Sequence, residues 1–224
     1  MRKIKDNLVT FIITIFILLI PMLLGVILWN KLPNEIATHW GPDGNPDGYS
    51  SRAVAVFVMP AFLLALHLIG SLATAKKDTG AISNKLFCLL LWFCPVMSIV
   101  ITTFIYAIAL GYEVNMPFVV LMLIGIIYIV LGNYLPKARQ NYFFGVRMKW
   151  TLESKKNWEH TNRFFAKIMV ALGLIYILCA VLAVFVEMKT ALVVIVFGTL
   201  IGAVFAMILY SYLYYLKHNQ DEDY

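Results

Sequence analysis

Charged residues are scarce in this sequence. Only 13% of its 224 residues are Asp, Glu, Lys or Arg, whereas soluble domains usually carry about 25%. Apolar residues make up 62% of the chain, and the mean hydropathy is +0.83. No polar segment is long enough to form a large soluble domain. The composition therefore predicts a membrane protein with several spans, not a soluble domain with an anchor.

Cysteine is absent from every polar segment. The three cysteines, Cys88, Cys94 and Cys179, all lie within apolar runs, so no disulfide framework is expected. Cys88 and Cys94 are six positions apart and would lie on different faces of a helix, which argues against a metal site. We predict no metal and no other cofactor.

Motifs of membrane enzymes are also missing. The sequence has no His-Glu-x-x-His, no Gly-x-Ser-x-Gly and no carboxylate pair at membrane depth, so catalysis is not expected. The apolar run at residues 8–29 is too long for a signal peptide and is followed by no small-x-small cleavage site. It predicts a retained first helix.

What the chain has instead is a series of long apolar runs. A membrane-crossing helix needs about 20 apolar residues, and six runs reach that length. They lie near residues 8–29, 53–75, 86–110, 117–135, 164–186 and 191–216. The expected fold is an all-α membrane protein, a bundle of six transmembrane helices.

Basic residues gather on one side of these six runs. All but three of the 18 Lys and Arg residues fall in the N-terminal segment, the second and fourth connections and the tail, and the exceptions are Lys31, Arg52 and Lys189. The positive-inside rule places the basic side in the cytoplasm, with both termini. The net charge of +6 then reflects membrane insertion and attraction to anionic lipids, and no nucleic-acid binding is predicted.

The spacing of the connections suggests an internal repeat. A long connection followed by a short one occurs in each half, and both long connections begin after a Leu-Pro pair. The first long connection would face outwards and the second inwards, as in a 3+3 inverted repeat. We expect two parts: residues 1–75 with an extracytoplasmic loop at 31–52, and residues 76–224 with a cytoplasmic loop at 136–163.

The first connection is rich in turn-forming Gly, Pro and Asp residues, which predicts a compact knot of turns. Trp40 is of the type that anchors proteins at membrane interfaces. His39, Asp43 and Asp47 could together hold a cation, but they lack a defined ligand spacing, and we expect no metal there.

In the second apolar run His67 is ionisable, which raises a functional hypothesis. A neutral, hydrogen-bonded histidine between helices is the favoured interpretation.

The fourth connection differs from a plain linker. Its residues 141–163, which we call the platform segment, interleave aromatic residues with Lys and Arg. Thr151 and Ser154 are good helix N-caps, so a helix should begin near Leu152 or Lys155 and continue into the fifth span. Gly145 permits a tight turn before it. Two interpretations stay open: a membrane-surface helix with aromatic anchors, or a docking platform for a partner.

Two segments carry a resemblance to a known family. The platform segment, NYFFGVRMKWTLESKKNWEHTNR, resembles the signature loop of the SdpI immunity family. The segment LPNEIATHWGPDGNPD at residues 32–47 is similar to the small domain of unknown function that often precedes it. Lys149 stands where the family pattern more often has Pro, before the Trp-Thr pair.

The resemblance implies two sets of functional residues. The cytoplasmic set is Asn141, Gly145, Arg147, Trp150, Thr151, Trp158, Asn162 and Arg163. The extracytoplasmic set is Pro33, His39, Trp40, Gly44 and Asp47.

The resemblance further implies a multi-pass protein of the bacterial cytoplasmic membrane that protects against a secreted, membrane-active peptide toxin. It also implies a receptor that holds a soluble transcriptional repressor at the cytoplasmic face. The alternative is a small transporter or channel-like protein, which the repeat and His67 favour. The near absence of charge within the helices argues against that alternative.

Overall fold

The computed structural model describes residues 2–41, 43–75, 82–185 and 189–218. It divides into two compact units. Unit 1 comprises residues 1–78 and 83–115, and unit 2 comprises residues 79–82 and 116–224. Each unit is described by itself below.

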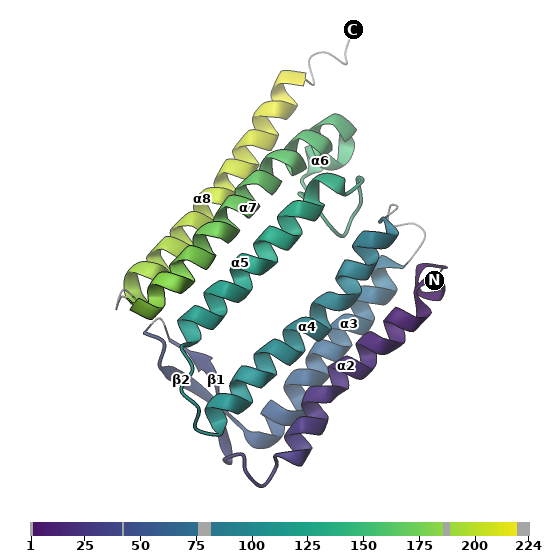
Figure 1. The fold of residues 1–224 in the computed structure, drawn as a ribbon. Coiled ribbons are helices and arrows are strands. Elements are labelled where there is room, and N and C mark those ends of the chain that lie inside the picture. Colours follow the sequence, from purple (N-terminus) through teal and green to yellow (C-terminus); the bar gives the residue numbers. More distant parts are fainter. Residues whose placement is uncertain (1, 42, 76–81, 186–188, 219–224) are drawn as a thin grey trace. The chain divides into compact units, whose positions relative to one another are not determined.

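Unit 1 consists of three long helical segments and a hairpin (Figure 1). The short helix α1 (Arg2–Asp6) leads into α2 (Leu8–Ile27). A π-helical turn, η1 (Val54–Val58), continues directly into α3 (Met59–Thr74), and α4 (Asn84–Ala109) completes the unit. The hairpin lies at the end of the unit where α2 and α4 finish, and the N-terminus lies at the opposite end (Figure 1).

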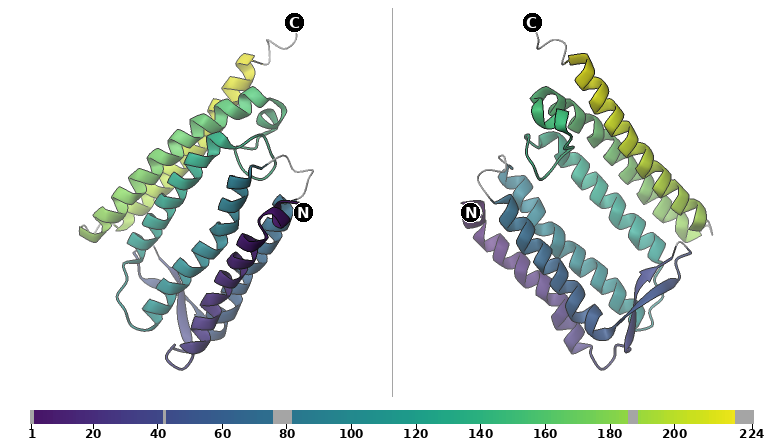
Figure 2. Two further views of the ribbon diagram at one scale, coloured as in Figure 1. Left: turned by 45° about the vertical axis from the view of Figure 1, so that its right-hand side comes forward. Right: turned by 180° about the vertical axis from the view of Figure 1, so that it is seen from behind.

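Unit 2 consists of three long helices and an irregular segment. Helix α5 (Met116–Tyr134) ends in a 3-10 turn, η3 (Leu135–Lys137). The short helix α6 (Lys149–Glu153) precedes α7 (Lys155–Phe185), and α8 (Lys189–His218) follows. Helices α5, α7 and α8 lie side by side, with α6 at the end where α5 finishes and α7 begins (Figure 2).

Six helical segments within the described residues are long and apolar enough to cross a membrane. This confirms six helices of the predicted length and apolar character, although the fifth of them begins at Lys155, nine residues before the predicted apolar run. The additional turns form the helix that was expected to lead into that span. The second and fifth connections, near residues 76–85 and 187–190, lie partly outside the described residues.

The expectation of an all-helical fold is wrong in one place. The first connection is an antiparallel hairpin of β1 (Glu35–Trp40) and β2 (Pro46–Ser51), where the sequence predicted only turns. Pro, Asp and Gly in β2 disfavour a strand, so local propensity concealed it. Tertiary contacts stabilise the hairpin instead, because Ile36 and Leu32 are buried with Val56 and Tyr106 in one apolar cluster.

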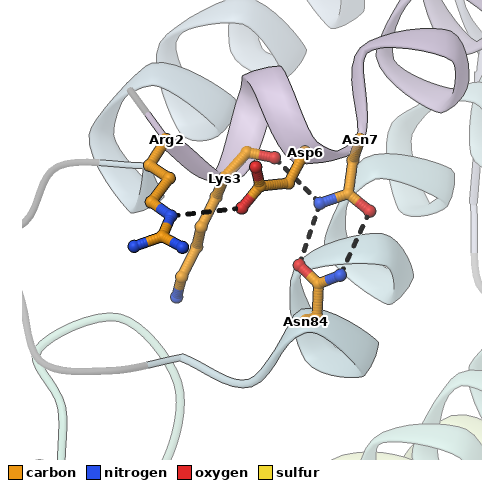
Figure 3. Close-up of polar contacts among 5 residues, drawn as sticks. All are labelled: Arg2, Lys3, Asp6, Asn7 and Asn84. Atoms are coloured by element: carbon orange, nitrogen blue, oxygen red, sulfur yellow. Dashed lines mark hydrogen bonds and ion pairs between the residues drawn. The ribbon is translucent and has the colours of Figure 1, made fainter.

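Two asparagine side chains join the beginnings of α2 and α4 (Figure 3). Asn7 Nδ2 donates to Asn84 Oδ1 at 2.9 Å and to the Lys3 carbonyl at 2.8 Å. Arg2 and Asp6, which are exposed, form an ion pair at 3.8 Å beside them. Partial burial lowers the pKa of the Lys3 ammonium below its ordinary value.

His67 lies between α2 and α3, where it is only 2% exposed. Its Nε2 is 3.1 Å from Thr14 Oγ1, and its ring stacks on Phe11. These contacts agree with a hydrogen-bonded histidine packed between helices, the favoured sequence interpretation.

Glycines allow α5 and α7 to approach closely within unit 2. A Cβ atom on Gly125 would lie 2.8 Å from the Gly173 carbonyl oxygen, and one on Gly173 would lie 2.6 Å from the Gly125 carbonyl oxygen. Two turns further along α5, a Cβ on Gly132 would lie 3.0 Å from the Ala166 carbonyl oxygen. Small residues thus form the helix contact, as is common between membrane helices.

Candidate functional site

The hairpin of unit 1 exposes a paired histidine and aspartate. His39 on β1 lies opposite Gly48 on β2, and its Nδ1 is 2.5 Å from Asp47 Oδ1. Both side chains are more than half exposed. A Cβ on Gly48 would meet the His39 Cβ at 2.9 Å, so glycine here leaves space for the imidazole. The pair offers an external partner one exposed hydrogen-bonding surface.

The tip of the hairpin is fixed by its own polar groups. The Gly44 N–H donates to the Gly41 carbonyl at 2.9 Å, and Gly44 has a φ of 77°, a conformation that favours glycine. The Asp43 carboxylate accepts from the backbone and side-chain N–H groups of Asn45. This confirms the turns predicted at the tip.

The base of the hairpin is tied to the end of α2 by Arg52. Its guanidinium donates to the carbonyls of Trp29 and Leu32 and to Asn34 Oδ1, and it lies 4.4 Å from the centre of the Trp29 ring. Trp40 is partly buried and packs against the apolar cluster below, a contact that the interfacial-anchor interpretation did not include. Pro33 is exposed.

The platform segment of unit 2 is organised by buried amides. Asn141 is 2% exposed. Its Oδ1 accepts from the N–H groups of Phe143 and Phe144, both at 2.8 Å, and its Nδ2 donates to the carbonyls of Arg139 and Phe144. One side chain therefore satisfies four backbone groups of the loop, which fixes the turn before Gly145.

Gly145, Trp158 and Asn162 are brought together at the next step of the loop. Asn162 Oδ1 accepts from the Val146 N–H at 2.9 Å, and Trp158 Nε1 donates to the Ala138 carbonyl at 2.8 Å. Gly145 has a φ of 130°, and a Cβ there would lie 2.6 Å from the Trp158 ring. Helix α7 thereby holds both ends of the loop against its first turns.

Thr151 closes the same network. It is fully buried, and its Oγ1 accepts from the Met148 N–H at 2.9 Å and donates to the Val146 carbonyl at 2.8 Å. The Ser154 hydroxyl accepts from the Asn157 N–H at 3.2 Å. Ser154 therefore caps α7 as predicted, whereas Thr151 stabilises α6 from within its first turn.

The platform segment is also bonded to α8. Trp150 Nε1 donates to Ser211 Oγ at 3.0 Å, and Asn157 Nδ2 donates to the Ser211 carbonyl at 3.1 Å. The Trp150 ring packs at an angle against Tyr212 and Tyr215. A conformational change in the platform segment would therefore alter its contacts with α8.

The predicted cytoplasmic residues divide by exposure. Asn141, Thr151, Trp158 and Asn162 are buried and shape the loop, so they are not surfaces that a soluble partner can touch. Arg147 and Arg163 are exposed, and Arg147 donates to the Tyr142 carbonyl at 2.5 Å. A role in contacting a partner stays a prediction for these two arginines.

Sequence reasoning missed several residues that hold these two surfaces. Arg52 was counted only as a charge on the sparsely basic side, yet it anchors the hairpin. Asn157 and Ser211 link α7 to α8. The available signal was an amide or hydroxyl on an otherwise apolar helix face, where a buried polar group needs a partner.

No three His, Cys, Asp or Glu side chains gather in a group that could hold a metal ion in the part of the chain that the structure describes. The candidate cation ligands of the first connection are instead bonded in pairs, His39 to Asp47 and Asp43 to Asn45.

Comparisons with known proteins agree with this arrangement. The model of the SdpI/YfhL protein family matches residues 137–211, and that of a domain of unknown function (DUF1648) matches residues 16–64. Immunity protein SdpI of Bacillus subtilis (strain 168) is 32% identical over 214 residues, which cover 93% of this chain and 97% of that protein. No solved structure matches.

The six apolar helices, the hairpin and the folded platform segment define a multi-pass membrane protein of the cell membrane. The chain belongs to the SdpI family, because the similarity extends over nearly all of both proteins and includes both predicted motif segments.

Proposed function

We propose that this protein confers immunity on a bacterial cell against a secreted, membrane-active peptide toxin. The observation that carries the proposal is its similarity, over 93% of the chain, to a protein named for immunity. The shared length covers both the hairpin and the platform segment, so the whole architecture, and not one motif, supports the same role.

In this proposal the hairpin is extracytoplasmic and recognises the toxin. The charge distribution supports that orientation, since the platform segment lies on the side of the apolar runs that carries all but three of the 18 Lys and Arg residues. The exposed His39–Asp47 pair and the exposed Tyr49 on the same strands would supply polar and aromatic contacts to a peptide. The contact residues we propose are His39, Trp40 and Asp47, with Pro33 and Gly44 shaping the hairpin.

A gain-of-function survival assay tests the proposal. The chain is expressed in a sensitive bacterium, which is challenged with a panel of secreted membrane-active peptides beside cells carrying the empty vector. We expect the expressing cells to survive a higher concentration of at least one peptide. Equal killing of both strains by every peptide, with the protein present in the membrane fraction, would argue against immunity.

We also propose that the platform segment is cytoplasmic and binds a soluble transcriptional repressor. Its exposed arginines, Arg147 and Arg163, suit an acidic patch on such a partner. Toxin bound at the hairpin would favour one of two conformations, and the partner would bind that conformation more tightly.

Co-expression with a candidate repressor tests this second role. The fraction of repressor in the membrane is measured with and without toxin, for the wild type and for Arg147→Gln with Arg163→Gln. We expect the double variant to release the repressor while survival is unchanged. Loss of survival and repressor binding together, at normal protein levels, would show that the roles are not separable.

An inverted 3+3 repeat is proposed for the architecture. Each unit contains three spans, and in each the long connection follows the first span. A superposition of the two units by rotation about an axis in the membrane plane would support the repeat.

A further inference from the structure

A second candidate site lies in unit 2 and includes the α7 part of the platform segment. A pocket of about 510 Å³ separates the segment that follows α5 from the first turns of α7. Its cationic lining residues are Lys137, Arg139, Lys155 and Arg163, and its single acid is Glu159. The pocket therefore has a formal charge of +3, and its volume is within the range of small-molecule sites, about 300–1,000 Å³.

The cations of this pocket are not neutralised by the protein. Within the described ranges, no ion pair involves any of the four. Arg139, Lys155 and Arg163 are exposed. Glu159 forms no ion pair with Lys155 or Arg163, which lie four positions before and after it in α7. Like charges gathered without a counter-charge are costly unless an anion joins them.

The shape of the pocket is held by its floor. Trp158 lines it, and the hydrogen bond from its Nε1 to the Ala138 carbonyl joins the two walls at 2.8 Å. Trp158 is only 1% exposed, so it supports the pocket from behind, and its indole N–H, already used in this bond, is no donor to a ligand. A ligand would thus meet four cations beside the exposed, apolar Pro136, which suits an amphipathic anion.

The position of the pocket identifies the source of that anion. The apolar span ending at Lys137 and the span beginning at Lys155 both meet the pocket at their polar ends. In a protein whose helices cross the bilayer, such polar ends lie near the lipid headgroups, and basic pockets between them bind anionic headgroups. We propose that the pocket binds the phosphodiester headgroup of an anionic phospholipid.

Native mass spectrometry of the full chain in detergent micelles tests the proposal. Phosphatidylglycerol is titrated, with phosphatidylcholine as the zwitterionic comparison. We expect phosphatidylglycerol to bind more tightly than phosphatidylcholine. Arg139→Gln with Lys155→Gln should weaken phosphatidylglycerol binding by about thirtyfold, since each of the two basic residues contributes about 1 kcal/mol near a lipid surface.

The matched control is Lys149→Gln with Lys156→Gln, which removes the same charge from the same connection, residues 136–163, outside the pocket. It should bind phosphatidylglycerol like the wild type, and both variants should keep the wild-type melting temperature. Equal weakening of phosphatidylglycerol binding in the two variants would show general attraction to the basic surface and would overturn the site. Wild-type binding by the pocket variant would also overturn it.

Two competitors separate the lipid from other anions. Glycerol phosphate carries the headgroup chemistry without acyl chains, and an oligo-glutamate peptide represents an acidic protein. We expect neither to displace phosphatidylglycerol at matched concentration. Displacement by glycerol phosphate would assign the pocket to a free phosphate compound, and displacement by the peptide alone would assign it to a protein partner. Either result would contradict the proposal.

Discussion

At the scale of single residues, Gly145 shows how tightly the platform segment is built. Its φ of 130° is unfavourable for any residue with a side chain, and the ring of Trp158 occupies the place of a Cβ. The same glycine lies beside Asn162, whose Oδ1 would be 3.0 Å from that Cβ. The backbone conformation at position 145 and the packing around it are therefore two separate reasons for a glycine there.

We predict that Gly145→Ala destabilises the protein by about 1–3 kcal/mol, the usual cost of backbone strain, with a further cost for displacing Trp158. The measurement is the apparent melting temperature in detergent. Gly198→Ala is the matched control, because a Cβ there meets nothing within 4 Å. A Gly145 variant as stable as the Gly198 variant would show that the loop accommodates a side chain.

At the scale of elements, the contact between α5 and α7 depends on small residues. We predict that Gly125→Val lowers the melting temperature, because the new side chain meets the Gly173 carbonyl and Ile177. Overpacking of this kind costs about 1–3 kcal/mol. Gly202→Val, at an open position of α8, should have a much smaller effect. An equal loss of melting temperature in the two variants would show that valine destabilises the helix itself and that the contact between α5 and α7 is not responsible.

Helix α6 offers a stabilising change. Lys149 is its first residue, and the preceding Met148 has φ −105° and ψ 159°, which suits the residue before a proline. We predict that Lys149→Pro raises stability by about 0.4–1 kcal/mol through a less flexible unfolded chain. Thr151→Pro should instead destabilise, since the Thr151 N–H donates to the Met148 carbonyl. A loss of stability in Lys149→Pro would contradict this geometry.

The sequence predicted best those elements that are determined by residues within the element itself. Six apolar runs predicted six helices, and Ser154 marked the beginning of α7. The hairpin was missed because Ile36 and Arg52 stabilise it through contacts with α2 and the helices around them, and not through strand propensity. The burial of Asn141 and Asn162 was missed for the same reason: an asparagine in a basic loop looks solvent-exposed until its four backbone partners are known.

At the scale of the whole molecule, the orientation in the membrane is open to direct measurement. We predict that Tyr49→Cys reacts with a membrane-impermeant maleimide in intact cells and that Tyr142→Cys reacts only after permeabilisation. Both tyrosines are about equally exposed, at 60% and 62%, so accessibility within the fold is matched. The background is a chain with Cys88, Cys94 and Cys179 replaced by Ala. Labelling of Tyr142→Cys in intact cells would reverse the proposed orientation.

The central claim is that an extracytoplasmic hairpin recognises a toxin, and survival of cells carrying hairpin variants tests it most directly. His39→Gln with Asp47→Asn removes the exposed pair without touching the apolar cluster. Arg2→Gln with Asp6→Asn removes a different exposed pair, an ion pair at the opposite end of unit 1, and serves as the control (Figure 3). At equal abundance, we predict that the hairpin variant loses protection while the control keeps it. Full protection by the hairpin variant would contradict recognition at this pair.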